Sequence, residues 1–277
     1  MSLTESIDAL GPDAIHRAVH GDRAAVDELL RALQRPFYNL ALRMLGNRSE
    51  AEDATQECLL RVITHLSSYR GEAKFKTWAT RVAVNVILDF RSGLARNART
   101  TFDTFAQMLE KGRDNSAIER PEDALLLKQA KTQCCRALLQ CLDGDHRVAF
   151  VLGQILEFEA ADAAEILGLQ AAAYRKRLSR ARAELTDILS RECSVHTAGR
   201  ACACHRKLGG AIASGRLDPN RLEVQIADLA QLRTRLSVLD QEHRTDGLYQ
   251  GDEQPDLREQ VLDSVRGALF DVGTVTS

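Results

Sequence analysis

The chain has 277 residues, of which 44% are hydrophobic, 27% charged and 5% aromatic. This length suffices for one large domain or two to three small ones, and the low aromatic and proline content favours helices over a β-sandwich or barrel. The apolar runs are too short to span a bilayer, and the N-terminal residues lack the basic start and apolar core of a secretory signal. We therefore expect a cytoplasmic, all-α protein without membrane insertion.

The formal net charge of −2 hides an uneven distribution. Residues 170–191 carry six cationic side chains against two acidic ones, a local balance of +4. Residues 209–277 carry seven arginines against twelve acidic residues, a balance of −5. A basic segment is thus masked by an acidic tail, and the nearly neutral total does not exclude nucleic acid as a partner.

The first part of the chain predicts a small helical domain over residues 12–95. Apolar residues recur at three-to-four spacing, which predicts helices over 13–46, from Ser49 to Leu66 with Ser49 as the N-cap, and over 75–92. The residues after Leu66, up to Glu72, are expected to form a loop. Residues 96–121 are polar and irregular in pattern, and we assign them as an interdomain linker because such a length is unusual inside one compact domain.

A second helical domain is predicted over residues 122–190. Its expected helices cover 122–142, 145–156, 160–167 and about 171–190. The short third helix, the turn at Gly168 and the basic fourth helix form a helix-turn-helix pattern. In the fourth helix the spacing predicts a core face made of Tyr174, Leu178, Ala181 and Leu185.

The opposite face of that helix then points outward. It carries Arg175, Lys176, Ser179 and Arg182, as a helix entering a DNA major groove requires. The alternative is an amphipathic helix whose basic side is merely solvated.

The seven cysteines, in a chain without an export signal, indicate thiols or metal ligands rather than a disulfide framework. Four of them lie in helical stretches and are expected to be small buried hydrophobes: Cys58, Cys134, Cys135 and Cys141. In residues 191–208 three cysteines occur with two histidines, a donor set that suits Zn²⁺ or Cu(I): Cys193, His196, Cys202, Cys204 and His205. The spacing matches no standard zinc finger, so redox-active thiols and unliganded surface cysteines stay as alternatives.

Two segments resemble the bacterial RNA polymerase sigma factors of the extracytoplasmic-function group. The stretch Tyr69-Arg-Gly-Glu-Ala-Lys-Phe-Lys-Thr-Trp78, continuing to Asn85, Asp89 and Arg91, resembles region two, and Glu50-Ala-Glu-Asp-Ala-Thr-Gln-Glu57 is similar to its polymerase-docking helix. Residues 136–187 resemble region four. The resemblance implies a transcription initiation factor that is not an enzyme, binds core RNA polymerase and directs promoter recognition.

The resemblance also assigns roles in region two. It implies that Asp53, Gln56 and Glu57 face the clamp of the polymerase β′ subunit. It implies contacts with the minus-ten DNA for Tyr69, Arg70, Lys74, Trp78, Asn85 and Arg91. Helix periodicity favours the core for the aromatic pair Phe75 and Trp78, so the loop residues Tyr69, Arg70 and Lys74, if exposed, are the better candidates to stack on or pair with unpaired DNA.

In region four the resemblance implies reading of the minus-thirty-five element and contact with the polymerase β flap. Arg175, Lys176 and Ser179 are the expected base-facing residues, and the expected phosphate contacts are Arg177, Arg180 and Arg182. The sequence departs from the family at Gln170-Ala-Ala-Ala-Tyr174, where small polar residues are usual. Three alanines remove a helix cap and hydrogen-bond donors from the start of the recognition helix.

The remaining tail, 209–277, is expected to be acidic and helical, with helices near 220–243 and 256–270. It either covers the basic helix or only keeps the tail soluble. Some sigma factors of this group look similar in carrying a C-terminal Cys-rich segment that senses metal in place of a separate anti-sigma protein, so metal or redox regulation and an anti-sigma partner are both expectations. The rival functions are a stand-alone helix-turn-helix regulator and a metal-storage or redox protein.

Overall fold

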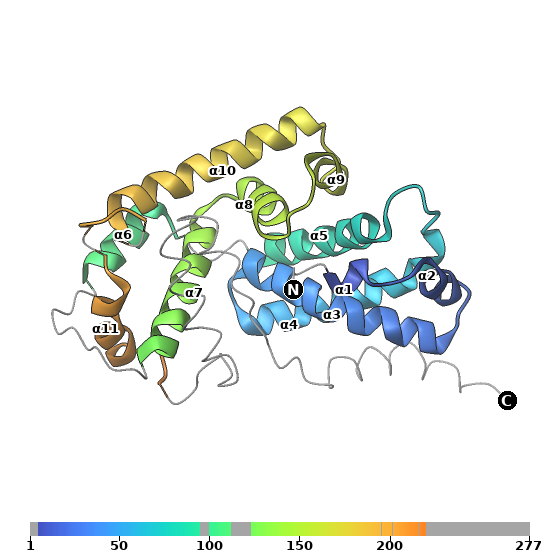
Figure 1. Ribbon diagram of the computed structural model, residues 1–277, viewed down its shortest axis with the longest axis horizontal. Coiled ribbons are helices and arrows are strands. Elements are labelled where there is room, and N and C mark those ends of the chain that lie inside the picture. The colour runs from blue at the N-terminus through green and yellow to red at the C-terminus, as the bar shows by residue number, and fades with distance from the viewer. Residues whose placement is uncertain are drawn as a thin grey trace. The chain divides into compact units, whose positions relative to one another are not determined.

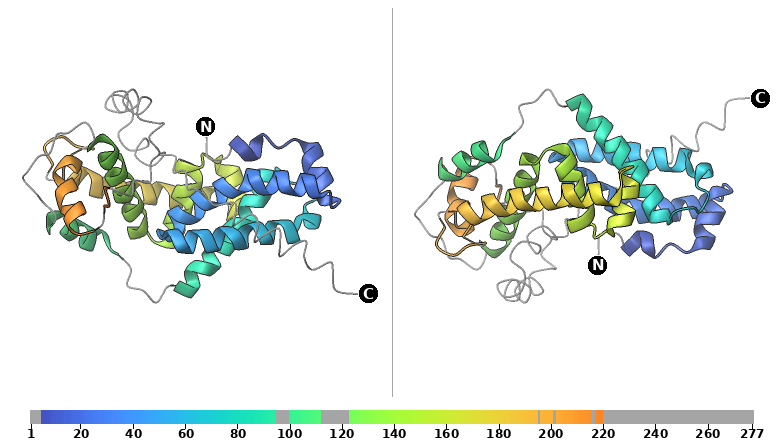
Figure 2. Two further views of the ribbon diagram at one scale, coloured as in Figure 1. Left: turned by 90° about the horizontal axis from the view of Figure 1, so that it is seen from below. Right: turned by 90° about the horizontal axis from the view of Figure 1, so that it is seen from above.

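The computed structural model describes residues 5–94, 100–111, 123–194, 196–200, 202–215 and 217–219, and these are helical apart from turns and loops (Figures 1 and 2). Among them the β-type pairing is a single parallel bridge between Cys193 and Cys202. The expected all-α class is therefore confirmed. No helix in this described part of the chain is long and apolar enough to cross a membrane.

The described residues divide into two compact units, which we treat separately. The first unit contains those of 1–98 and 151–176, and the second contains those of 99–150 and 177–254. Region four as predicted from the sequence, 122–190, is thus shared between the units. The recognition helix changes unit between Lys176 and Arg177.

The N-terminal helices of the first unit are α1 (Glu5–Asp8), α2 (Pro12–Val19), α3 (Arg23–Leu45), α4 (Arg48–Thr64), the short η1 (Leu66–Ser68) and α5 (Phe75–Leu94). Helix α3 packs against α2, α4 and α5. Its apolar stripe is fully buried at Leu29, Leu30 and Leu33, and α4 and α5 add Leu59 and Ile87 to the same core. This core holds α4 and α5 side by side, which positions the polar residues on their outer faces.

The single helix predicted over 13–46 is two helices. Gly21 has a φ of +86°, a left-handed conformation that a glycine adopts without steric cost, and it separates α2 from α3. Asp22 then caps α3, because its Oδ1 accepts hydrogen bonds from the amides of Ala24 at 2.9 Å and Ala25 at 3.2 Å. The prediction missed this break because the apolar spacing continues across it.

The predicted cap of the next helix was also wrong. Helix α3 ends at Gly46, which is left-handed with a φ of +79°. Asn47 is the N-cap of α4, and its Oδ1 accepts a hydrogen bond from the amide of Glu50 at 3.2 Å. Ser49 lies inside the first turn instead. Asparagine and serine are about equally good caps, so composition alone does not separate the two positions.

The remaining elements of the first unit are η2 (Val151–Ile155), one turn of π-helix, and α9 (Ala160–Ile166), which packs on α5. The π turn ends the helix predicted over 145–156: the amide of Leu156 donates to the carbonyl of Val151 at 2.9 Å, and Glu157 follows in the left-handed region with a φ of +55°. Gly168, with a φ of +64°, makes the expected turn after α9.

The second unit contains α6 (Phe102–Lys111), α7 (Asp123–Cys141), α8 (Gly144–Phe150), most of α10 (Ala171–Glu192), η3 (Cys204–Lys207) and α11 (Leu208–Ala213). Helix α6 corrects the linker prediction, because it lies inside 96–121. It packs on α7 and buries Phe105 to 5% exposure. The predicted tail helices near 220–243 and 256–270 lie outside the described residues.

Candidate nucleic-acid and polymerase interface

The polar side of α4 carries the three residues expected to face the polymerase. Asp53 is exposed and Gln56 and Glu57 are half-buried, because the opposite side of the helix is buried at Ala51, Ala54, Thr55, Cys58 and Leu59. Arg61, one turn further on, donates from Nη2 to Glu57 Oε1 at 2.9 Å. Helix periodicity therefore placed these residues on one surface of α4, and their role at that surface stays a prediction.

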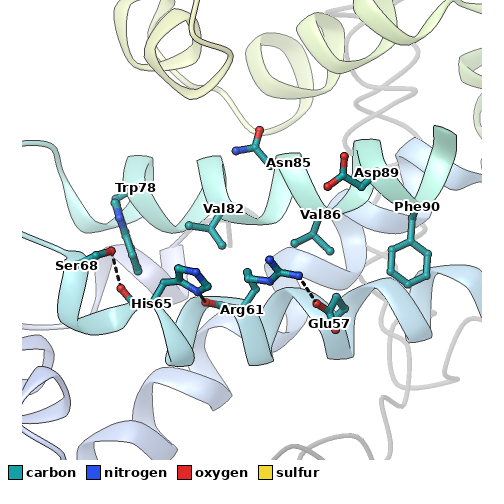
Figure 3. A pocket seen from close by; sticks show the side chains of 10 residues that line it. All are labelled: Glu57, Arg61, His65, Ser68, Trp78, Val82, Asn85, Val86, Asp89 and Phe90. Atoms are coloured by element: carbon teal, nitrogen blue, oxygen red, sulfur yellow. Dashed lines mark hydrogen bonds and ion pairs between the residues drawn. The ribbon is translucent and has the colours of Figure 1, made fainter. Parts of the chain in front are cut away.

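A groove of 440 Å³ runs between α4 and α5 (Figure 3). Val82 and Val86 of α5 form its aliphatic part, with aromatic side chains of α5 at either end, Trp78 and Phe90. Polar side chains come from α4, from α5 with Asn85 and Asp89, and from η1, where Ser68 Oγ donates to the carbonyl of His65 at 2.7 Å. The full lining is Glu57, Arg61, His65, Ser68, Trp78, Val82, Asn85, Val86, Asp89 and Phe90.

Tyr69 is not the freely exposed stacking residue that we expected. Its hydroxyl donates to the carbonyl of Ala73 at 3.0 Å, and its ring lies 5.3 Å from Phe75 and 5.4 Å from Trp78, centre to centre. Burial raises the pKa of the Tyr69 hydroxyl. Phe75 is 6% exposed, as periodicity predicted, whereas Trp78 is half-buried and lines the groove. The three rings form one cluster that fixes the loop before α5.

The two cations of this loop differ in their surroundings. Arg70 is exposed. Lys74 Nζ lies 3.1 Å from Asp162 Oδ2 of α9, and its side chain remains 74% exposed. The hydrogen bond and charge of Asp162 raise the pKa of Lys74, so this ammonium is charged but already paired. A DNA phosphate would have to replace Asp162 there.

The outer face of α5 carries Asn85 and Arg81, both exposed and one turn apart. Asn85 was selected from the sequence and Arg81 was not, although the spacing of four residues places both on the same side of the helix. Arg91 belongs to α5, but its side chain lies outside the described residues.

Helix α10 has the two faces that its sequence predicts. Tyr174, Ala181 and Leu185 are at most 1% exposed, and Leu178 is half-buried. The outward face is exposed at Arg175, Lys176, Ser179, Arg180 and Arg182. Buried Tyr174 holds the start of this helix in the core, in keeping with its place on the predicted core face. Such a row of cations on one side of a helix is complementary to a phosphate backbone and to guanine edges in a major groove.

Arg177 departs from this pattern. It is half-buried, and its Nη2 lies 3.2 Å from Asp145 Oδ2 of α8. Close by, the His146 ring lies between two carboxylates, with Nδ1 2.6 Å from Glu184 Oε1 and 3.0 Å from Asp143 Oδ2. These contacts join α8 to α10, so Arg177 is already paired with Asp145, and its expected phosphate contact stays a prediction.

The residues expected to bind a metal are only partly brought together. Cys193 and Cys202 are paired in the parallel bridge, and Cys204 starts η3. His205 is exposed, and His196 Nδ1 lies 3.1 Å from Thr197 Oγ1. Among the described residues, no three His, Cys, Asp or Glu side chains are arranged as a ready-made metal site.

Comparison with known proteins identifies two family models in this chain. Sigma-70 region 2 matches residues 29–97, and Sigma-70, region 4 matches residues 132–185. The chain is 30% identical over 178 residues to the ECF RNA polymerase sigma factor SigE of Mycolicibacterium smegmatis, covering 63% of this chain and 66% of that protein, slightly less than two thirds of its length. It is 27% identical over 179 residues to SigW of Bacillus subtilis, covering 62% and 92% respectively.

A solved complex, the sigma factor RpoE with the anti-sigma factor NepR from Bartonella quintana, is 22% identical, with a TM-score of 0.41, and covers 59% of this chain and 95% of that one.

Proposed function

We propose that this chain, a member of the extracytoplasmic-function group of RNA polymerase sigma factors, binds the polymerase, the minus-ten DNA and the minus-thirty-five DNA with different helices. As a member of this group it directs promoter-specific initiation of transcription and is not an enzyme. Its partners are core RNA polymerase and promoter DNA. Because both are cytoplasmic in bacteria, we propose that the protein acts in the cytoplasm. An anti-sigma protein remains a prediction of the resemblance alone.

In this proposal α4 is the docking surface for the polymerase. The carboxylates of Asp53 and Glu57 lie one turn apart on a face whose reverse side is anchored in the core. Such a face suits a basic partner, because its carboxylates are held on a helix that is already folded before the partner binds. Arg61 already pairs with Glu57, so the exposed Asp53 is the more available of these two carboxylates.

The minus-ten region is assigned to the loop before α5 and to the exposed face of α5. Arg70, Lys74 and Asn85 supply the polar contacts, and Arg81 joins them on the geometry of the helix. Tyr69 supports this surface from beneath rather than stacking freely, because its ring and hydroxyl are both engaged. Trp78 and Phe90 are the aromatic side chains that line the groove, and Trp78 is the one that packs against the loop residue Tyr69.

The minus-thirty-five element is assigned to α10, and this helix carries the proposal. Arg175, Lys176 and Ser179 are the base-facing residues, with Arg180 and Arg182 on phosphates. The supporting observation is that these side chains are exposed on one face while Tyr174, Ala181 and Leu185 on the other are buried. A stand-alone helix-turn-helix regulator would use the same face, but it would leave the region-two match unexplained.

Run-off transcription with purified core polymerase tests the proposal. The wild-type chain should direct initiation from a subset of genomic fragments, and Asp53→Lys should reduce polymerase binding without changing the fold. Initiation that does not depend on the added chain would refute the central function.

Arg175→Ala is the matching test at the DNA. Loss of a base contact costs about 1–3 kcal/mol, roughly 5- to 150-fold in promoter affinity, and relaxes the preference at one position. Loss of a phosphate contact would instead weaken all sequences alike and lower the salt slope by about 0.9. Arg200→Ala, an exposed arginine away from α10, is the control and should change neither. If the two variants behave alike, α10 is not the reading helix.

A further inference from the structure

Six of the seven cysteines belong to the second unit, and all of these except Cys141 gather where the chain that follows α10 meets α7. Cys193 and Cys202 are the two residues of the parallel bridge. The amide of Cys202 donates to the carbonyl of Glu192 at 3.0 Å, and the amide of Ser194 donates to the carbonyl of Cys202 at 3.0 Å. Neighbouring strands lie about 4.8 Å apart, so this pairing holds two thiol-bearing residues side by side.

Helix α7 contributes Cys134 and Cys135, and η3 contributes Cys204. The η3 turn, which begins at Cys204, contacts α7, and so does α11 directly after it. Behind this contact Leu126 of α7 packs with Leu208 and Leu217 in a small core of its own. The turn carrying Cys204 is therefore held against α7 by apolar burial, and Cys204 lies close enough to Cys134 and Cys135 to raise the pKa of both.

Cys202 is buried and Cys134, Cys193 and Cys204 are half-buried, and these thiols lie close enough to affect one another's pKa. Burial raises the pKa of Cys204 to about 12, with further increases from Cys193 and Cys202. Burial also raises the pKa of Cys134 well above its usual value, and Cys135, Cys204, Cys202 and Cys193 raise it further. Cys135 is 8% exposed in the core, whereas Cys134 is half-buried beside the other three. This contradicts the simple expectation that Cys134 only fills the core.

We propose that Cys134, Cys193, Cys202 and Cys204 bind one Zn²⁺ and thereby fasten the segment from Cys193 to Pro219 onto α7. Four cysteines are a common structural zinc set, and zinc then contributes directly to folding. On binding Zn²⁺ the four thiols become thiolate ligands, and four protons are released. The parallel bridge pairs Cys193 with Cys202, η3 holds Cys204 against α7, and Cys134 of α7 lies within electrostatic reach of all three. The described side chains are not arranged as a metal site, so binding requires these thiols to reorient.

This ligand set differs from the one predicted from the sequence. It replaces His196 and His205 by Cys134, a residue some 60 positions earlier, because His205 is exposed and His196 is hydrogen-bonded to its neighbour. Lys131, one turn before Cys135, lies close enough to Cys204 to favour its thiolate, which helps to balance the negative charge of the complex.

Zinc content of the purified full-length chain tests this proposal. Wild type, purified without chelator or reconstituted with Zn²⁺ and desalted, should hold one zinc per chain by mass spectrometry. Cys204→Ser and Cys134→Ser should lose it. The matched control is Cys141→Ser, on the same helix as Cys134, where the thiol donates to the carbonyl of Ala137 at 3.4 Å; it should keep the zinc. A Cys134→Ser chain that binds zinc as wild type does would overturn the assignment.

A measurement on the unmutated chain guards against variants that fail to fold. Titration with a mercurial reagent should release zinc as four thiols react, and Co²⁺ in place of zinc should give a charge-transfer band of tetrathiolate intensity. Absence of metal under both loadings, or a mass two hydrogens lower that maps to a Cys193–Cys202 disulfide, would also overturn the proposal. Neither readout uses promoter DNA or polymerase, so its failure would leave the proposed function untouched.

Discussion

Arg147 is the buried cation that joins α7 to α8, and replacing it should loosen this corner of region four. The side chain is 4% exposed. Its Nη2 donates to the carbonyl of Gln140 at 2.8 Å and to that of Leu142 at 3.0 Å, and its Nη1 donates to Gln140 Oε1. The carbonyls at the end of α7 have no partner within the helix, so Arg147 caps that helix from the next one.

The size of the effect follows from these bonds. Arg147→Met keeps the length of the side chain and removes its charge. It leaves two backbone carbonyls unsatisfied at about 1–3 kcal/mol each, and removing the buried charge offsets part of that loss. We expect a net loss of about 2–4 kcal/mol of stability in α7 and α8. Arg147→Lys keeps the charge but loses the fork of donors, and should lose about half as much.

Amide hydrogen exchange followed by mass spectrometry is the suitable assay, since it reports each helix separately. A loss of about 2–4 kcal/mol corresponds to roughly 30- to 700-fold faster exchange in α7 and α8. The amides of α4 serve as the internal reference and should exchange as in wild type. Exchange in α7 and α8 that changes less than twofold in Arg147→Met would refute the capping argument.

Three further outcomes are expected. Asn47→Ala should cost about 1 kcal/mol and lower the Tm of region two by several degrees, whereas Ser49→Ala should leave it unchanged in calorimetry; the reverse order would show that Asn47 is not the cap. The Asp22 carboxylate has a lowered pKa because it accepts hydrogen bonds from the Ala25 amide and Arg17. Its contribution to the stability of the fold is therefore present above the usual pKa of an aspartate and is lost as the pH falls through the lower pKa of the folded state. Asp22→Asn should flatten the acid limb of a curve of Tm against pH. Asp162→Asn should leave the Tm unchanged and raise affinity for single-stranded minus-ten DNA by no more than about fivefold, measured by fluorescence anisotropy, because it frees Lys74; unchanged affinity would mean that Lys74 is not a DNA contact.

The local periodicity of the sequence was sufficient to predict the buried and exposed faces of α10 and α4. In both helices the apolar spacing specifies a buried stripe, so the exposed row from Arg175 to Arg182 and the outward position of Asp53 could be predicted without a structure. Helix α6 was missed because it is short and lies among polar residues, and its burial of Phe105 depends on contact with α7.

Contacts between distant residues were beyond sequence reasoning. The ion pair between Lys74 and Asp162 joins positions 88 residues apart, and the approach of Cys204 to α7 depends on how two helices pack. Tyr69 was misjudged for a related reason: an aromatic residue in a predicted loop gives no sign that its ring will pack on the first turn of the following helix.

The groove between α4 and α5 contains Trp78, the single tryptophan of the chain. The tryptophan fluorescence of the unlabelled protein therefore arises from one position, beside the surface assigned to unpaired DNA and next to the helix assigned to the polymerase. A base that stacks on this indole would quench its emission, and a partner that covers α4 alone would shift it without quenching. The isolated chain thus carries its own optical probe for the binding of single-stranded DNA at this surface.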